Sequence, residues 1–497
     1  MGGAQAVRRS RSSEGNAGTR PEKAFPQTGT KDMYDTIRSL LGALFLSLFL
    51  GAAAQAGQDD ASRSQDILAY LQAIPGMQAE ELDNPPSGYR YFLLRYEQPI
   101  DHANPARGTF KQRMVLLHRS QRAPMVLATN GYDIPVTPAR YAITRALDAS
   151  QLKVEHRYFA ESRPDPLDWT YLTLQQAAAD HHRIVQAIRP FYSGKWVSTG
   201  ASKGGMTAIY HRRYYPNDVD GTLANVAPQS FARLDPRYAA FQAQVGSAAC
   251  RNDLKQYQRE VLKRREVMKG YIQAYGNDNG LAFNLPGGLD QALDHTVGEL
   301  YFQFFQYGDL KNCASIPATS ASDQELFDFL LAWGPLSAMS DDERDRYEPY
   351  YYQAITQFGY PRLLTGHLAD LLRYDPNDYR VYVSQWPRQP FDPSLMWDIA
   401  GFVALQSRNV MMIYGDIDPW TAAAFFLPRS ASRGTRLFMV PGGNHGSDLP
   451  SLSEADRKEA YALLERWTGV KPSEPPRMLK PGVFEENSEE FLLRRPL

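Results

Sequence analysis

The chain has 497 residues, of which 43% are hydrophobic, 12% aromatic and 22% charged, and this composition excludes an intrinsically disordered protein because it supplies ample apolar material for a core. Lysine and arginine together number 54 against 55 aspartates and glutamates, so no strong net charge attracts the chain to nucleic acid or to an anionic membrane. A small neutral or zwitterionic substrate fits this balance better.

The N-terminal region has the pattern of an export signal. Arg38 precedes a short apolar run over residues 40–50, which is followed by AAAQA at 52–56, a site of the kind that signal peptidases cleave. The run is shorter than the roughly 20 residues that span a bilayer, so we expect a cleaved signal peptide and no stable membrane insertion after its removal, and a retained membrane anchor is the alternative. Because residues 1–32 precede this unit, Met33 is a candidate for the true start. The sequence therefore predicts a secreted protein, extracellular or periplasmic.

Short β-rich runs bounded by turn residues begin at Tyr89, and several of them are continuously apolar. Helical spacing of apolar residues predicts helices over 172–189 and from Ser202 to about 214. Strands that alternate with helices in this way predict a mostly parallel sheet with helices on its faces. The predicted strands cover 89–96, 110–118, 125–129, 152–158, 196–199 and 222–227.

This alternation stops between about residues 231 and 398, where long polar-aromatic stretches predict helices. Aromatic side chains at helical spacing indicate a core, and the alternative is an apolar pocket for a proline ring. We expect one α/β domain split by a helical insertion that covers its active site. The predicted helices of the insertion cover 250–275, 289–306 and 323–333, and the pattern resumes with strands over 409–414 and 436–440 and a helix over 454–467.

A G-x-S-x-G motif stands directly after one predicted strand and directly before a predicted helix. In the sequence WVSTGASKGG (196–205), Ser202 occupies the turn at which a nucleophile elbow exposes its hydroxyl, and the small neighbours let the flanking backbones approach closely. The structural alternative is an ordinary strand-to-helix turn, because glycine and serine are common in loops. The strand and helix on either side favour Ser202 as a nucleophile.

A serine hydroxyl needs a base to take its proton and a carboxylate to hold that base in the right tautomer. In hydrolases with this elbow, the acid and the histidine follow the serine in that order. Among nine histidines, His445 is the one that follows a late strand in a glycine-rich loop, so we expect it to be the base. Asp418, at the end of the preceding strand, is the expected acid, and Asp416 is the alternative.

The oxyanion of an acyl-transfer intermediate requires two backbone N–H donors. We expect the first from Lys203, the residue after the nucleophile. The strand over 125–129 ends in a glycine turn, so the second donor is expected from Tyr132, with Gly131 as the alternative.

Cys250 and Cys313 are the two cysteines of the chain. In a protein that carries an export signal they predict a single disulfide, and two separate buried thiols are the alternative. No group of cysteines and histidines has the spacing of a zinc site. We therefore expect neither a metal nor another cofactor.

These motifs predict an α/β-hydrolase fold with a large helical cap insertion. A leader over 1–56 precedes the first part of the hydrolase domain at 57–230, the cap at 231–400, the second part of the hydrolase domain at 401–470, and a C-terminal tail at 471–497.

Several motifs resemble those of the secreted prolyl tri/tetrapeptidyl aminopeptidases of actinobacteria, serine peptidases related to lysosomal Pro-Xaa carboxypeptidase and dipeptidyl peptidase II. The resemblance spans about residues 89–467. It implies an α/β-hydrolase with a helical cap, a triad of Ser202, Asp418 and His445, and peptide substrates cut after proline near a free N-terminus. The motifs that carry it are QPIDH (98–102), GTFKQR (108–113), EHRYF (155–159) with Glu161-Ser162, the segment 200–228, and GDIDPW (415–420).

The ammonium of a peptide substrate needs an acidic partner. Glu155 and Glu161 are candidates, although either could instead form a salt bridge with Arg157 or Arg163.

Two other functions compete with a peptidase. A secreted esterase or lipase would use the same triad, but a lipase needs a strongly apolar lid and this insertion is polar-aromatic. A non-catalytic binding protein on a hydrolase scaffold would not need the three triad residues.

Overall fold

The computed structural model describes residues 66–387, 389–428 and 433–473. The expected leader at 1–56 and nearly all of the expected tail at 471–497 lie outside these residues. Among the helices in the described ranges, none is both long enough and apolar enough to cross a membrane.

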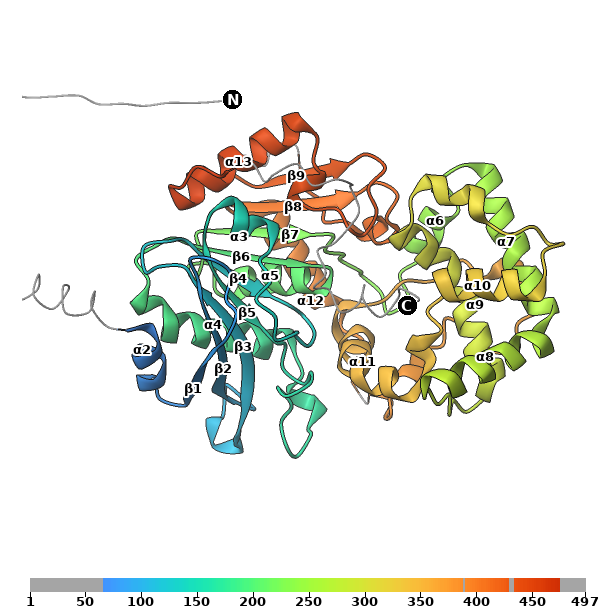
Figure 1. Ribbon diagram of the computed structural model, residues 1–497, viewed down its shortest axis with the longest axis horizontal. Helices are drawn as coiled ribbons and strands as arrows, with labels where there is room; N and C mark the ends of the chain where they lie inside the picture. Colours follow the sequence, from blue (N-terminus) through green and yellow to red (C-terminus); the bar gives the residue numbers. More distant parts are fainter. Residues whose placement is uncertain (1–65, 388, 429–432, 474–497) are drawn as a thin grey trace, which may run out of the picture. The chain divides into compact units, whose positions relative to one another are not determined.

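The described strands form one nine-stranded sheet in the order β1-β2-β3-β5-β4-β6-β7-β8-β9 (Figure 1). The pairs β1–β2, β2–β3 and β3–β5 are antiparallel. The remaining five pairs, which join β5, β4, β6, β7, β8 and β9 in that order, are parallel. The mostly parallel sheet expected from the sequence is therefore confirmed. The strands are β1 (Met77–Leu82), β2 (Arg90–Pro99), β3 (Thr109–His118), β4 (Met125–Thr129), β5 (Ser150–Val154), β6 (Trp196–Ala201), β7 (Gly221–Asn225), β8 (Val410–Gly415) and β9 (Arg436–Val440).

Helices cover both faces of this sheet, because successive side chains of its buried central strands point to opposite sides. Met125 and Leu127 pack on one face with α4 and α2. Val126, between them, packs on the other face with α3 and α13. The helices of this part are α2 (Ile67–Ala73), α3 (Ala142–Ala146), α4 (Leu174–Ile188), α5 (Lys203–Tyr214) and α13 (Glu454–Thr468).

After β7 the chain leaves the sheet and returns at β8. Most of the intervening helices gather beside the carboxyl ends of the parallel strands (Figure 1). The last of them, α12, packs against α5, where Arg213 pairs with Asp398 at 2.9 Å. The helices of this insertion are α6 (Arg237–Gln242), α7 (Ala248–Lys263), α8 (Arg265–Asn279), α9 (Gly288–Tyr307), α10 (Asp323–Trp333), α11 (Asp341–Gln353) and α12 (Pro393–Gly401).

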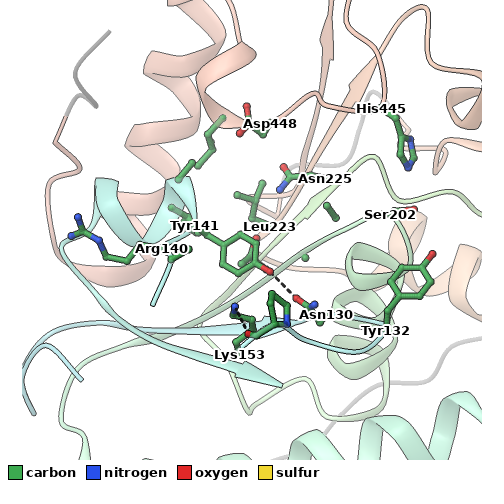
Figure 2. A pocket seen from close by; sticks show the side chains of 18 of the residues that line it. Asn130, Tyr132, Arg140, Tyr141, Lys153, Ser202, Leu223, Asn225, His445 and Asp448 are labelled. Atoms are coloured by element: carbon green, nitrogen blue, oxygen red, sulfur yellow. Dashed lines mark hydrogen bonds between the residues drawn. The ribbon is translucent and has the colours of Figure 1, made fainter. Parts of the chain in front are cut away.

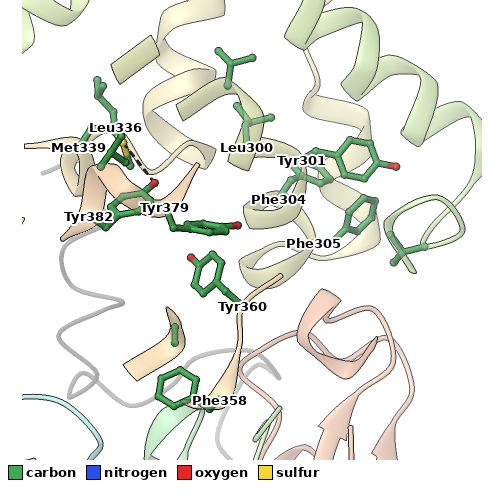
Figure 3. Packing of buried hydrophobic residues seen from close by; sticks show 14 of the residues in the cluster. Leu300, Tyr301, Phe304, Phe305, Leu336, Met339, Phe358, Tyr360, Tyr379 and Tyr382 are labelled. Carbon is green, nitrogen blue, oxygen red and sulfur yellow. Dashed lines mark hydrogen bonds between the residues drawn. The ribbon is translucent and has the colours of Figure 1, made fainter. Parts of the chain in front are cut away.

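The aromatic residues of the insertion form its core. Phe304, Tyr379 and Tyr382 are buried and belong to one cluster that continues to α5 and β8 (Figure 3). The hydroxyl of Tyr382 donates to Glu299 at 2.7 Å, so this polar atom is satisfied inside the core. Packing, rather than a substrate pocket, accounts for these side chains.

The helices α2, α3, α6, α11 and α12 have no counterpart among the predicted ranges, and three other elements differ from the prediction for a local reason. The strand expected over 152–158 is β5, which starts earlier and ends at Val154, because the chain then turns with Tyr158 at φ 73°. The helix expected over 250–275 is divided at Arg264, where ψ is 26°. Strand β1 was not predicted, since its sequence MQAEEL is mostly exposed and has little apolar alternation.

Cys250 and Cys313 form the disulfide that the sequence predicts. It joins the first turn of α7 to the 3₁₀ turn after α9, across a sequence separation of 63 residues. A crosslink over a loop of this length restricts the unfolded chain more than the folded one.

Replacing both cysteines by serine should therefore lower the free energy of unfolding by about 2–4 kcal/mol. Denaturant melts of the variant and of the parent protein, each with and without a reductant, measure this difference. The reductant should bring the parent protein down to the stability of the variant. Equal stability of the two oxidised proteins would contradict the prediction.

Candidate active site

Ser202 lies on a strained turn between β6 and α5. Its φ of 53° and ψ of −126° belong to a region that residues with a side chain rarely adopt. The backbone N–H of Ser202 donates to the carbonyl of Asn225 on the neighbouring strand at 3.0 Å. Strain of this kind persists where surrounding contacts hold it, and it is common at functional sites.

The turn after β4 lies directly against this elbow because both segments lack side chains at the contact. A Cβ on Gly131 would lie 2.6 Å from the backbone nitrogen of Gly204, and a Cβ on Gly204 would lie 2.5 Å from the carbonyl oxygen of Thr129. Any larger residue at either position would push the two backbones apart. The contact brings together the segments that carry Tyr132 and Lys203, the expected oxyanion donors.

His445 and Asp418 form a buried pair. Nδ1 of His445 lies 2.6 Å from Oδ2 of Asp418, and both side chains are almost completely inaccessible to solvent. Oδ1 of the same carboxylate accepts the backbone N–H of Trp420 at 3.0 Å. Burial raises the pKa of Asp418, and the adjacent His445 opposes that rise. Nε2 of His445 is also buried and has no hydrogen-bond partner among the residues that the structure describes, so it is open to accept a proton.

Asp416 has a different role from Asp418. Its Oδ1 accepts the backbone N–H of Gly442 at 2.6 Å, which shapes the turn that leads to His445. Asp418, and not Asp416, contacts the imidazole.

The C-terminal end of α9 anchors the loop that carries His445. The backbone N–H of His445 donates to Gln306 at 2.9 Å. The side-chain amide of Asn444 donates to the carbonyls of Tyr307 at 2.9 Å and Gly308 at 3.1 Å. Sequence reasoning missed Asn444, because its partners are backbone oxygens of a distant segment. These three hydrogen bonds fix the imidazole from the side of the insertion.

Ser202, His445 and Tyr132 line one cavity of about 140 Å³ (Figure 2). Its wall continues along the loop after β4, from Asn130, and into α3 as far as Arg145, with Tyr307 and Tyr347 contributed by α9 and α11. The structure thus brings the proposed nucleophile, the proposed base and one expected oxyanion residue to the same space, with Asp418 behind the histidine.

Helix α11 also contacts the loop after β4. The ring of Tyr132 packs edge-on against Tyr347, with centroids 5.8 Å apart, and lies 5.7 Å from Tyr350. Asp133, the next residue, forms an ion pair with Arg346 of α11 at 2.8 Å. The insertion therefore holds this loop as well as the His445 loop.

The structure does not bring Glu155 or Glu161 to the cavity. The carboxylate of Glu155 is fully buried, pairs with Arg113 and accepts the backbone N–H of Ile134 at 3.1 Å. Glu161 pairs with Arg95 at 2.8 Å and with Arg113 at 3.2 Å. Both glutamates form salt bridges, but their partners are not Arg157 and Arg163, the two that the sequence suggested. Through its hydrogen bond with Ile134, Glu155 also anchors the start of the loop that lines the cavity.

Arg157 joins two of the sequence motifs, QPIDH and EHRYF, in space. Its guanidinium is completely buried, pairs with Asp180 of α4 at 2.6 Å and donates to the carbonyl of Ile100 at 3.1 Å. Nε2 of His102 lies 2.7 Å from the same aspartate. QPIDH and EHRYF therefore meet around one buried ion pair that ties β2 and the turn after β5 to α4.

Within the described ranges, no group of three or more histidine, cysteine, aspartate or glutamate side chains is arranged to hold a metal ion.

Known proteins resemble this chain over different shares of its length. A prolyl tri/tetrapeptidyl aminopeptidase of Streptomyces mobaraensis is 41% identical over 88% of this chain and 93% of its own. A lysosomal Pro-X carboxypeptidase of Mus musculus is 29% identical over 31% of this chain and 35% of its own. A solved peroxisomal α/β-hydrolase of Saccharomyces cerevisiae is 12% identical, covers 84% of this chain and 94% of its own, and has a TM-score of 0.32. The family model for PS-10 peptidase S37 matches residues 60–481, and the chain therefore belongs to this family of serine peptidases.

Proposed function

We propose that the chain is a secreted serine aminopeptidase that releases short N-terminal peptides by cutting after proline. The observation that carries the proposal is the cavity that Ser202, on its strained elbow, and His445 line together (Figure 2), with Asp418 bound to the imidazole from behind. A triad of this kind would serve an esterase equally well. The match to the S37 peptidase family favours peptide substrates.

In the proposed reaction, Nε2 of His445 accepts the proton of Ser202 while the serine oxygen attacks the carbonyl of the scissile bond. Asp418 holds the imidazole in the required tautomer and stabilises the imidazolium that forms. The N–H groups of Lys203 and Tyr132 stabilise the tetrahedral oxyanion. The imidazolium then protonates the leaving amine, and a water molecule activated by the same histidine hydrolyses the acyl-enzyme.

The substrate assignment is supported by two observations. The relative from Streptomyces mobaraensis, which carries the name of such an enzyme, is similar to this chain almost from end to end. The insertion, for which we propose the boundaries 231–400, supplies Tyr307 and Tyr347 to the cavity wall. Aromatic faces beside the nucleophile suit the flat, apolar ring of proline.

An extracellular or periplasmic location is supported by the Cys250–Cys313 disulfide, because such bonds persist in oxidising compartments. The export pattern at residues 38–56 agrees with it. The proposed partner is a peptide substrate, and neither nucleic acid nor a membrane is required.

Asp418→Asn should reduce kcat by about 10⁴-fold, because an amide favours the wrong imidazole tautomer. Asp416→Asn is the matched control, since its carboxylate holds a turn and does not contact the imidazole; its effect should be much smaller. Steady-state kinetics on Ala-Ala-Pro p-nitroanilide compare the two variants. A larger loss in the Asp416 variant would transfer the acid role to Asp416.

An aminopeptidase recognises the free ammonium of its substrate, and a blocked N-terminus leaves the group that binds it unpaired. N-acetyl-Ala-Ala-Pro p-nitroanilide should therefore have a kcat/KM at least about tenfold below that of the free peptide. Ser202→Ala should be inactive on both substrates, which assigns the measured activity to this site. Equal values for the free and blocked peptides would reject the aminopeptidase assignment and leave the serine mechanism standing.

A further inference from the structure

We propose that Lys203 is a positioning residue for the oxyanion hole, because its side chain fixes the peptide unit whose N–H is the second donor. This inference rests on the proposed function, in which Tyr132 supplies that donor. Lys203 would thus contribute twice, since its own backbone N–H is the first donor.

The side chain of Lys203 is buried beside the cavity. The residue is 2% exposed, and Nζ donates a hydrogen bond to the carbonyl oxygen of Gly131. Nζ also lies 4.8 Å from the ring centroid of Phe159 and 5.4 Å from that of Tyr132, within the range of cation–π attraction. Lys203 is therefore bound to the turn after β4 through the Gly131 carbonyl and the Tyr132 ring, and to the turn after β5 through the Phe159 ring.

This placement is unfavourable for an ammonium group. Burial lowers the pKa of Lys203 well below its usual range, and no charged partner among the described residues offsets that shift. An apolar side chain of similar length would fill the same space without loss of hydration. The stability of the fold therefore does not account for a lysine at this position. The hydrogen bond from Nζ to the carbonyl of Gly131 does.

The geometry of a peptide unit connects this hydrogen bond to the donor. The peptide bond from Gly131 to Tyr132 is trans, since the one cis bond in the described residues is Asp165–Pro166. In a trans unit the C=O and the N–H point in opposite directions. When Nζ of Lys203 holds the oxygen of Gly131, the N–H of Tyr132 is directed to the opposite side.

Without this hydrogen bond, the peptide unit would have no side chain to fix its orientation at the glycine end. Gly131 has a φ of 81° and no Cβ, so its backbone can rotate with little steric resistance. At the other end, the carbonyl of Tyr132 accepts the N–H of His156 at 2.9 Å. Lys203 and His156 together hold both carbonyls that flank the donor, and Lys203 supplies the constraint at the flexible end.

The same hydrogen bond strengthens the donor. A donor on the carbonyl of a peptide polarises its N–H, and hydrogen bonds in a chain reinforce each other at low dielectric. The effect is larger for a charged donor, although a neutral amine would still hold the carbonyl. Because the oxyanion exists only in the intermediate, loss of Lys203 should affect kcat far more than KM.

Lys203→Met removes the hydrogen bond and retains an unbranched side chain. We expect kcat on Ala-Ala-Pro p-nitroanilide to fall by about 10- to 100-fold with KM changed less than about threefold, and the rate of Ser202 phosphonylation by a fluorophosphonate to fall by a similar factor. Lys203→Gln, whose amide is one bond too short to reach Gly131, should show the same losses. It replaces the methionine variant in the test if that variant does not fold. Lys203→Arg, which keeps a cationic donor, should recover part of kcat.

Arg212→Met is the matched control. Arg212 is a buried cation on the same helix, and it donates to the carbonyls of Val219 and Arg408 rather than to the turn after β4. This variant should lower the melting temperature without changing kcat or the phosphonylation rate.

The proposal is overturned if the Lys203→Met or Lys203→Gln protein is folded and keeps kcat and the phosphonylation rate within about twofold of the parent, or if its loss is confined to KM. It is also overturned if Arg212→Met loses as much activity at equal destabilisation, or if the arginine variant is no better than the methionine variant. Phosphonylation needs no peptide. A parent protein that reacts with the fluorophosphonate but does not cut the amide refutes only the proposed function, and a slower reaction of the Lys203 variant still supports the positioning role.

Discussion

The turn after β4 and the start of α5 lie in direct backbone contact, and this contact positions the residues of the site. Strands β4 and β6 are neighbours in the sheet, so their carboxyl ends lie at the same edge. The turn after β4 can then rest on the start of α5 because Gly131 and Gly204 carry no side chains there. This contact brings the expected oxyanion donors beside Ser202. The Lys203 side chain, the Glu155 carboxylate and the His156 N–H all hold the turn in that position.

The insertion between β7 and β8 lines part of the cavity and also holds the two loops that carry His445 and Tyr132. Helix α9 ends at the His445 loop and accepts its hydrogen bonds, while α11 packs on Tyr132 and pairs with Asp133. A displacement of the insertion would therefore disturb the proposed base and the second donor together. Its aromatic core and its disulfide hold its helices together.

Local patterns were enough to predict much of this organisation. The bounds of β4, β9 and α10 agree with the sequence prediction, because each is an apolar or capped segment with clear turn residues beside it. The same holds for the disulfide and for the parallel sheet. Asn444 and the Lys203 side chain gave no such signal, since their partners are carbonyl oxygens, which every residue has. Glu155 carried a signal for charge, but only the fold determines which arginine lies beside it.

Mapping a covalent label tests whether Ser202 is the nucleophile of this serine peptidase. The native protein is treated with a fluorophosphonate and digested, and the modified residue is identified by mass spectrometry. We expect one adduct per chain, on Ser202, and none when the protein is unfolded before treatment. An adduct on another residue, or a native protein that does not react, would reject Ser202 as the nucleophile.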